Sequence, residues 1–216
     1  LSYVYTSSGS KAQFVYDGVT LRSYNNVKPN VTHDIKVYKI KQYLVLSVDG
    51  KFENLVEYRP ATSMVGSLEP LPLTVGRHAT NSEAFFYGYL YSLKMTNFYR
   101  DEGLFNNYYP ENVSDIVVLN FEDGYYDEGG EYRQWRGSQS NLITTSSKKF
   151  GDSSLRLGAS GVSTVSVERD PGLDLKEDDF TFETWLNPAS RPSTGGESII
   201  LTNGRDTLVD YAGSLP

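Results

Sequence analysis

The sequence has 216 residues, a net charge of −7 and no cysteine, with 17 Tyr, 10 Phe and 19 Gly. The acidic charge argues against nucleic-acid binding, and the lack of cysteine excludes disulfides and a thiolate site. No run approaches the roughly 18 apolar residues of a membrane span, and the aromatic and glycine content is typical of a β-rich chain with many turns.

The first half of the chain alternates apolar and polar residues in a way that predicts a series of β-strands. Asp17-Gly18 is a hairpin dipeptide between two of these strands, and Gly88 indicates a bulge or a close approach of two backbones. The predicted strands cover residues 1–6, 12–16, 19–24, 31–40, 42–50, 51–58, 73–77 and 84–98.

The second half contains the most informative strand, residues 179–188. Phe180 and Phe182 fall on one face and Trp185 on the other, which predicts a central strand that is covered on both sides. Pro188 ends the strand because proline cannot donate to the sheet. Further strands are predicted at 116–121, 141–145, 163–168 and 197–202, with a short one at 154–157 after the turn at Gly151.

Two motifs in this half resemble a known family. Phe150-Gly-Asp-Ser-Ser-Leu155 is followed by Phe180-Thr-Phe-Glu-Thr-Trp185. Together these motifs resemble the opening of a laminin-G-like, concanavalin-A-like jelly roll. The resemblance implies an all-β fold, a two-sheet antiparallel β-sandwich.

The first half resembles the closing part of the same family, so the order of the motifs is inverted. The matching segments are residues 32–37, 43–50, 72–76 and 85–97, while 116–121 is similar to the family's first strand. Residues 1–100 are therefore predicted to hold the later strands, 101–115 a connector, and 116–216 the early strands. Two interpretations remain: one circularly permuted domain, or parts of two tandem domains.

The acidic residues give little indication of catalysis. Glycan-cleaving enzymes need two carboxyl groups that flank the scissile bond, and Glu183 stands alone on its strand. His33 and His78 lack a nucleophile motif. We therefore predict a structural role for Glu183, a core or sheet-face position for His33, and no catalytic residue.

A Gly-rich, acidic loop at 125–140 carries the best candidates for ligand binding. Tyr125, Tyr126, Tyr132 and Trp135 lie in it, and exposed rings beside carboxylates and amides suit sugar binding. The alternative is that these rings cap an open end of the sandwich or pack on a neighbouring subunit.

Calcium is the one cofactor that the resemblance implies. Asp123 is a weak candidate ligand, because the family's second acidic position is occupied by Tyr91, which binds Ca²⁺ poorly. Asp123 also precedes a glycine, where turn formation is its ordinary role.

These observations favour a non-catalytic recognition or structural module on an extracellular, cell or virion surface, such as that of a phage or bacterium. We expect adhesion to carbohydrate or to a partner protein through rim loops, possible association with other copies or subunits, and no membrane insertion. The alternatives are a virion decoration protein without a glycan ligand and a glycan-cleaving enzyme. The chain begins at Leu1 without a methionine, so we expect a processed product or a piece of a longer protein.

Overall fold

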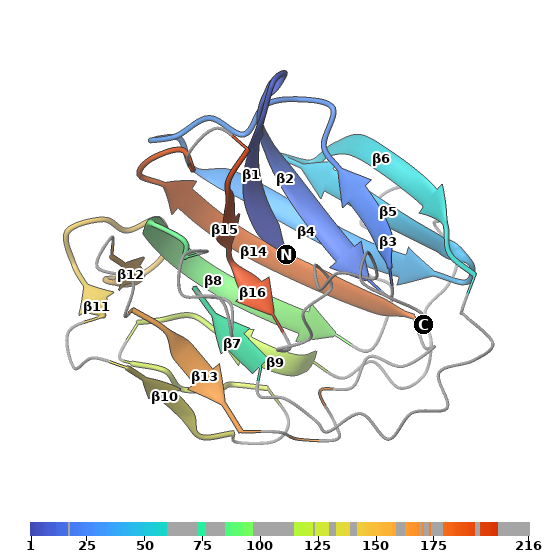
Figure 1. Ribbon diagram of the computed structural model, residues 1–216. Coiled ribbons are helices and arrows are strands. Elements are labelled where there is room, and N and C mark those ends of the chain that lie inside the picture. The colour runs from blue at the N-terminus through green and yellow to red at the C-terminus, as the bar shows by residue number, and fades with distance from the viewer. Residues whose placement is uncertain are drawn as a thin grey trace, which may run out of the picture.

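The chain folds into antiparallel β-sheets that do not close into a barrel, which confirms the predicted all-β sandwich (Figure 1). The described residues contain no α-helix. The computed structural model describes residues 1–16, 18–59, 73–76, 85–96, 115–122, 124–129, 133–138, 142–158, 163–168, 170, 173, 179–192 and 195–202.

One layer is an eight-stranded sheet in the order β11-β12-β8-β14-β4-β5-β6, with β9 pairing the C-terminal part of β8. Its strands are β4 (His33–Ile40), β5 (Tyr43–Val48), β6 (Lys51–Glu57), β8 (Gly88–Thr96), β9 (Asp115–Leu119), β11 (Ile143–Thr144), β12 (Ser154–Leu157) and β14 (Phe180–Pro188). We call this layer the large sheet.

Two four-stranded sheets lie over one side of the large sheet (Figure 1). The first has the order β15-β1-β2-β3, and the second has the order β10-β13-β7-β16. Their strands are β1 (Ser2–Thr6), β2 (Gly9–Tyr16), β3 (Val19–Arg22), β7 (Leu73–Val75), β10 (Trp135–Gly137), β13 (Val165–Val167), β15 (Glu197–Ile199) and β16 (Leu201–Thr202).

The predicted single strand at 197–202 is wrong, because the structure divides it between these two sheets. Ile200 separates β15 from β16 and is fully buried. Its backbone N–H donates to the Leu1 carbonyl and its own carbonyl accepts from the Gly76 N–H, both at 2.9 Å. Ile200 therefore joins the two small sheets into one layer.

Strand β14 is central, as predicted, because it pairs with β4 on one side and β8 on the other. Phe180, Phe182 and Leu186 point into a core that both layers share. The expectation that both faces are covered is wrong: Glu183 and Trp185 on the other face are only half-buried. No second layer of described residues packs on that side, since the small sheets occupy the opposite face (Figure 1).

Each sheet contains strands from both halves of the chain. β14 lies between two strands of the first half, and β1 pairs with β15. Because neither half could complete a sheet without the other, we propose a single permuted sandwich rather than parts of two tandem domains.

Two glycine predictions are confirmed. Tyr16 pairs with Val19, so β2 and β3 are joined by a two-residue turn that includes Gly18, with φ of 77°. At Gly88 the φ is 156°, and an added Cβ would lie 2.3 Å from the Asn187 carbonyl oxygen. The backbones of β8 and β14 therefore approach closely at Gly88, which needs a residue without a side chain.

Candidate functional site

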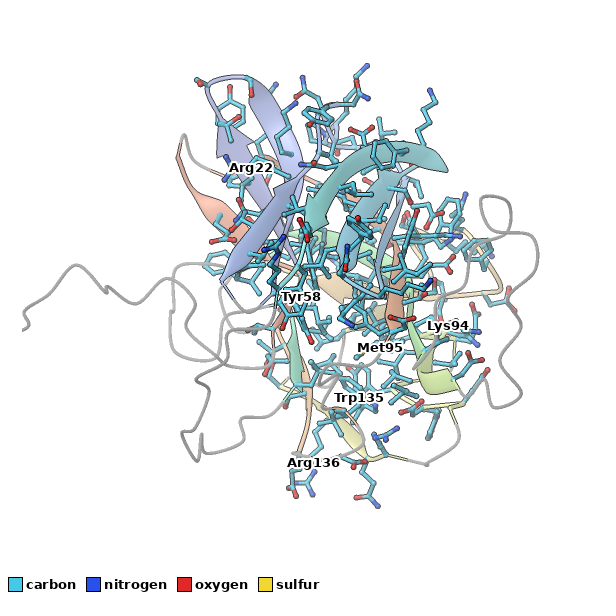
Figure 2. The ribbon with its side chains drawn as sticks, turned by 90° about the vertical axis from the view of Figure 1, so that its right-hand side faces the viewer. Arg22, Tyr58, Lys94, Met95, Trp135 and Arg136 are labelled. Carbon is cyan, nitrogen blue, oxygen red and sulfur yellow. The ribbon has the colours of Figure 1, made fainter. Side chains whose placement is uncertain are left out.

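The aromatic residues predicted to bind sugar do not form one open surface. Trp135 is 6% exposed and lies in β10, where it pairs with Val167 of β13, so the prediction that it sits in an open loop is wrong. Figure 2 shows Trp135 among packed side chains and its neighbour Arg136 at the lower edge of the molecule. Tyr126 is 73% exposed, whereas Tyr125 packs partly against the core. Tyr132 and Asp123 lie outside the described residues.

The Trp135 indole belongs to a buried polar network around Asp127. The Asp127 carboxylate accepts from the backbone N–H groups of Val118 and Gly129, each at 2.9 Å, and from the indole N–H of Trp135 at 3.3 Å. The Arg133 guanidinium lies 3.7 Å from the same carboxylate. Because these groups satisfy one another away from water, the network is structural.

A hollow of about 610 Å³ opens on the uncovered face of the large sheet. It lies over β4, β14, β8 and β9, with one wall from the loop at 148–153. Its lining residues are Lys36, Tyr91, Ser92, Leu93, Lys94, Val118, Asn120, Glu122, Phe150, Gly151, Glu183 and Trp185.

The strand register builds the floor of the hollow. Glu183 of β14 lies opposite Lys36 of β4 on one side and Lys94 of β8 on the other. Lys36 Nζ lies 3.2 Å from Glu183 Oε1, and Lys94 Nζ lies 2.7 Å from Asp115 Oδ2. In Figure 2, Lys94 lies toward the outer surface of the sheet, whereas the next residue, Met95, is buried.

Two residues after Glu183, Trp185 follows on the same face of β14. Its neighbours in register are Asp34 on β4 and Ser92 on β8. The Phe150 ring meets the indole edge to face, with centroids 5.5 Å apart and an interplanar angle of 86°. Lys149 Nζ lies over the indole, 4.1 Å from its centroid. The hollow therefore combines aromatic surface with charged groups that can donate and accept hydrogen bonds.

The wall at 148–153 is held by hydrogen bonds at its C-terminal end. The Glu122 carboxylate accepts from the backbone N–H groups of Asp152 and Ser153, and the Ser153 hydroxyl donates to the Phe121 carbonyl at 2.7 Å. These contacts hold the backbone two and three residues after Phe150, whose ring lies beside Trp185. Glu122 is thus a positioning residue for the wall.

Asp34 is the buried acid beside this floor. Its Oδ2 lies 3.7 Å from Lys36 Nζ, while its Oδ1 is buried and has no hydrogen-bond partner among the described residues. Burial raises the pKa of Asp34 to about 6, with Lys36 acting against the shift and Glu183 and Asp49 adding to it. Lys36 therefore sits between two carboxylates, of which only Glu183 lines the hollow.

His33 has the buried sheet-face position that the sequence predicts. Its Nδ1 lies 2.8 Å from Asp49 Oδ2, and its Nε2 lies 3.1 Å from the Lys28 backbone nitrogen, which can donate to it. Both ring nitrogens are therefore engaged, and no described serine hydroxyl contacts the ring. His78 lies outside the described residues.

The remaining acids of the hollow are also engaged. Glu183 is paired with Lys36, and Glu122 holds the wall; Asp34 lies beside the hollow and does not line it. Among the described residues, no group of three or more His, Asp or Glu side chains could hold a metal ion. The arrangement suits hydrogen bonding to a polyhydroxylated ligand better than proton transfer to one.

Comparison with known proteins gives no assignment: no protein-family model matches the sequence, and no curated protein matches it either. Within the described part of the chain, no helix has the length and apolar character needed to cross a bilayer. Functional inference therefore depends on the geometry of the hollow and on its chemistry.

Proposed function

We propose that this protein is a non-catalytic carbohydrate-recognition module and that the hollow on the large sheet holds the sugar. The observation that carries the proposal is Trp185, half-buried on an uncovered sheet face between Asp34 and Ser92 and next to the Lys36–Glu183 pair. An indole can pack on the apolar face of a sugar, while ammonium and carboxylate groups bond its hydroxyls. The resemblance to laminin-G-like domains is consistent with this role.

Recognition without cleavage is part of the proposal. Cleavage needs two carboxyl groups facing one bond, one of them able to donate a proton. Asp34 is the acid with the raised pKa, but its side chain is only 8% exposed and Lys36 lies between it and Glu183. We therefore expect Glu183→Gln to leave any trace of glycan hydrolysis unchanged in a reducing-end assay.

The proposal predicts that Trp185→Ala weakens sugar binding at least ten-fold, because the variant loses the aromatic surface of the site. A glycan array identifies a ligand for the unaltered protein, and isothermal titration calorimetry then measures its affinity for each variant. Tyr126→Ala is the matched control, since Tyr126 is an exposed aromatic of the predicted rim site. Loss of binding in Tyr126→Ala with full binding in Trp185→Ala would move the site to the rim.

A second candidate function is supported by a different observation on the same sheet face. Tyr43, Phe52 and Leu55 are exposed there, beside a small apolar cluster of Tyr38 and Val45. A contiguous apolar patch of this kind is typical of a protein contact surface. This patch supports a decoration or assembly protein, for which light scattering would show association at micromolar concentration.

We infer an extracellular or virion-surface location from composition. The chain has no cysteine and is rich in Tyr and Gly, which suits a bacterial or phage surface protein. Carbohydrate is a frequent partner at such a surface, so location and proposed ligand agree.

A further inference from the structure

We propose that the hollow selects sugars that carry a carboxylate and that Lys149 is the residue that recognises this group. The inference rests on the proposed function and adds the chemical class of the ligand. It starts from the cations that surround the hollow and from the partner that each of them has.

Lys149 differs from the other lysines around the hollow because no described carboxylate pairs with it. Lys94 Nζ is 2.7 Å from Asp115, Lys36 Nζ is 3.2 Å from Glu183, and Lys148 Nζ is 3.6 Å from Asp152. The Lys149 ammonium instead lies over two rings, 4.1 Å from the Trp185 centroid and 5.4 Å from the Phe150 centroid. A ligand carboxylate can therefore pair with Lys149 without breaking an internal ion pair.

The position of Lys149 also places it within reach of a bound sugar. A sugar ring in contact with Trp185 lies within a few ångström of an ammonium that is itself 4.1 Å from the indole centroid. A carboxylate on that ring can approach the ammonium to ion-pair distance while the ammonium stays over the indole. The ion pair therefore does not require Lys149 to give up its cation–π contact with the indole.

The acidic side chains in and beside the hollow repel a ligand carboxylate less strongly than their number suggests. Glu183 and Asp115 are each paired with a lysine, and Glu122 accepts from two backbone N–H groups. A cationic ligand, in contrast, would have to displace Lys149 from the indole. A neutral ligand would leave Lys149 with its cation–π contacts and no ion pair.

The experiment compares uronic acid oligosaccharides with their methyl esters, which keep the same ring and lack the charge. Galacturonate, glucuronate and mannuronate oligomers are titrated into the unaltered protein by calorimetry at low and high salt. We expect at least one acid to bind about five-fold tighter than its ester at low salt, because an ion pair at an exposed site is weak. The preference should fall at high salt.

Variants of Lys149 then separate charge from shape. Lys149→Gln should lower the affinity for the acidic oligosaccharide to that for its methyl ester and leave the affinity for the ester unchanged. Lys149→Arg should keep the preference for the acid. Lys148→Gln, which changes the neighbouring paired lysine, is the matched control and should keep it too.

Equal affinity for acid and ester, a preference that survives Lys149→Gln, or no binding of any acid would each overturn the inference. Neutral sugars that bind and depend on Trp185 would leave the proposed function intact in all three cases. If no sugar of any kind binds on the array or in the titrations, the proposed function fails as well.

Discussion

Replacing Asp127 by alanine will lower the free energy of unfolding by about 4 kcal/mol, because it leaves three N–H donors without their acceptor and removes one of the two carboxylates beside the buried Arg133 guanidinium. The Asp127 side chain is fully buried and serves Val118, Gly129 and Trp135 together with the Arg133 guanidinium. Arg133 retains its ion pair with Asp170, whose carboxylate lies 2.6 Å from the Arg133 Nε. The substitution therefore removes much of the stabilisation from the network but not all of it.

Urea denaturation followed by tryptophan fluorescence measures this loss, since Trp135 reports on the network itself. Asp152→Ala is the control: the side chain is 96% exposed and, within the described part of the chain, pairs with Lys148 alone, so we expect a change below about 0.5 kcal/mol. Asp127→Asn keeps the shape of the side chain and one acceptor oxygen. Its loss of unfolding free energy should therefore lie between those of Asp127→Ala and Asp152→Ala. A loss below about 1 kcal/mol in Asp127→Ala would contradict the structural role of the network.

Asp34→Asn will stabilise the protein by about 2 kcal/mol at pH 8, an effect that disappears in acid. Burial raises the folded-state pKa of Asp34 to about 6 from an ordinary value of 3.8, so the folded protein binds this proton more tightly than the unfolded chain does. The stability that depends on this group is therefore greatest below pH 3.8 and is lost as the pH rises to about 6. Asparagine carries no charge to bury and avoids that loss.

Denaturation curves of the unaltered protein and of Asp34→Asn, recorded from pH 4 to pH 8, check both the sign and the size of the stability difference. The difference in the free energy of unfolding should be small at pH 4, grow up to about pH 6 and then level off. Carboxylates far from Asp34 contribute equally to both proteins and cancel in the difference. Glu183 and Asp49, which raise the pKa of Asp34, contribute to the difference together with Asp34. A variant that is less stable than the unaltered protein at pH 8 would show that the Lys36–Asp34 contact outweighs the cost of burial.

The sequence predicts most strands because alternation reports directly on a sheet face. The order Phe-Thr-Phe-Glu-Thr-Trp in β14 places Phe180 and Phe182 inward and Glu183 and Trp185 outward, as the structure has them. The same alternation cannot say whether the outer face is covered, because coverage depends on segments far away in the chain. For this reason the alternation predicts an enclosed Trp185, whereas in the structure Trp185 lines an open hollow.

The candidate site was harder to predict than the fold. The sequence predicts only a structural role for Glu183, because its partners Lys36 and Lys94 come from strands that meet it only through register. Trp135 was misplaced because β10 has three residues, too few to show a period, in a Gly-rich segment. The spacing of Glu183 and Trp185 on one face was the one local signal that could have indicated the hollow.

The central position of β14 has a consequence for synthesis on the ribosome. β4 and β8 are complete once residue 96 has been made, yet the strand that joins them ends at residue 188. Throughout that interval the nascent chain carries two unpaired strand edges, which are templates for association with other chains. Slow, late closure of this kind is typical of folds dominated by long-range pairing, and it makes the growing polypeptide a natural client for chaperones.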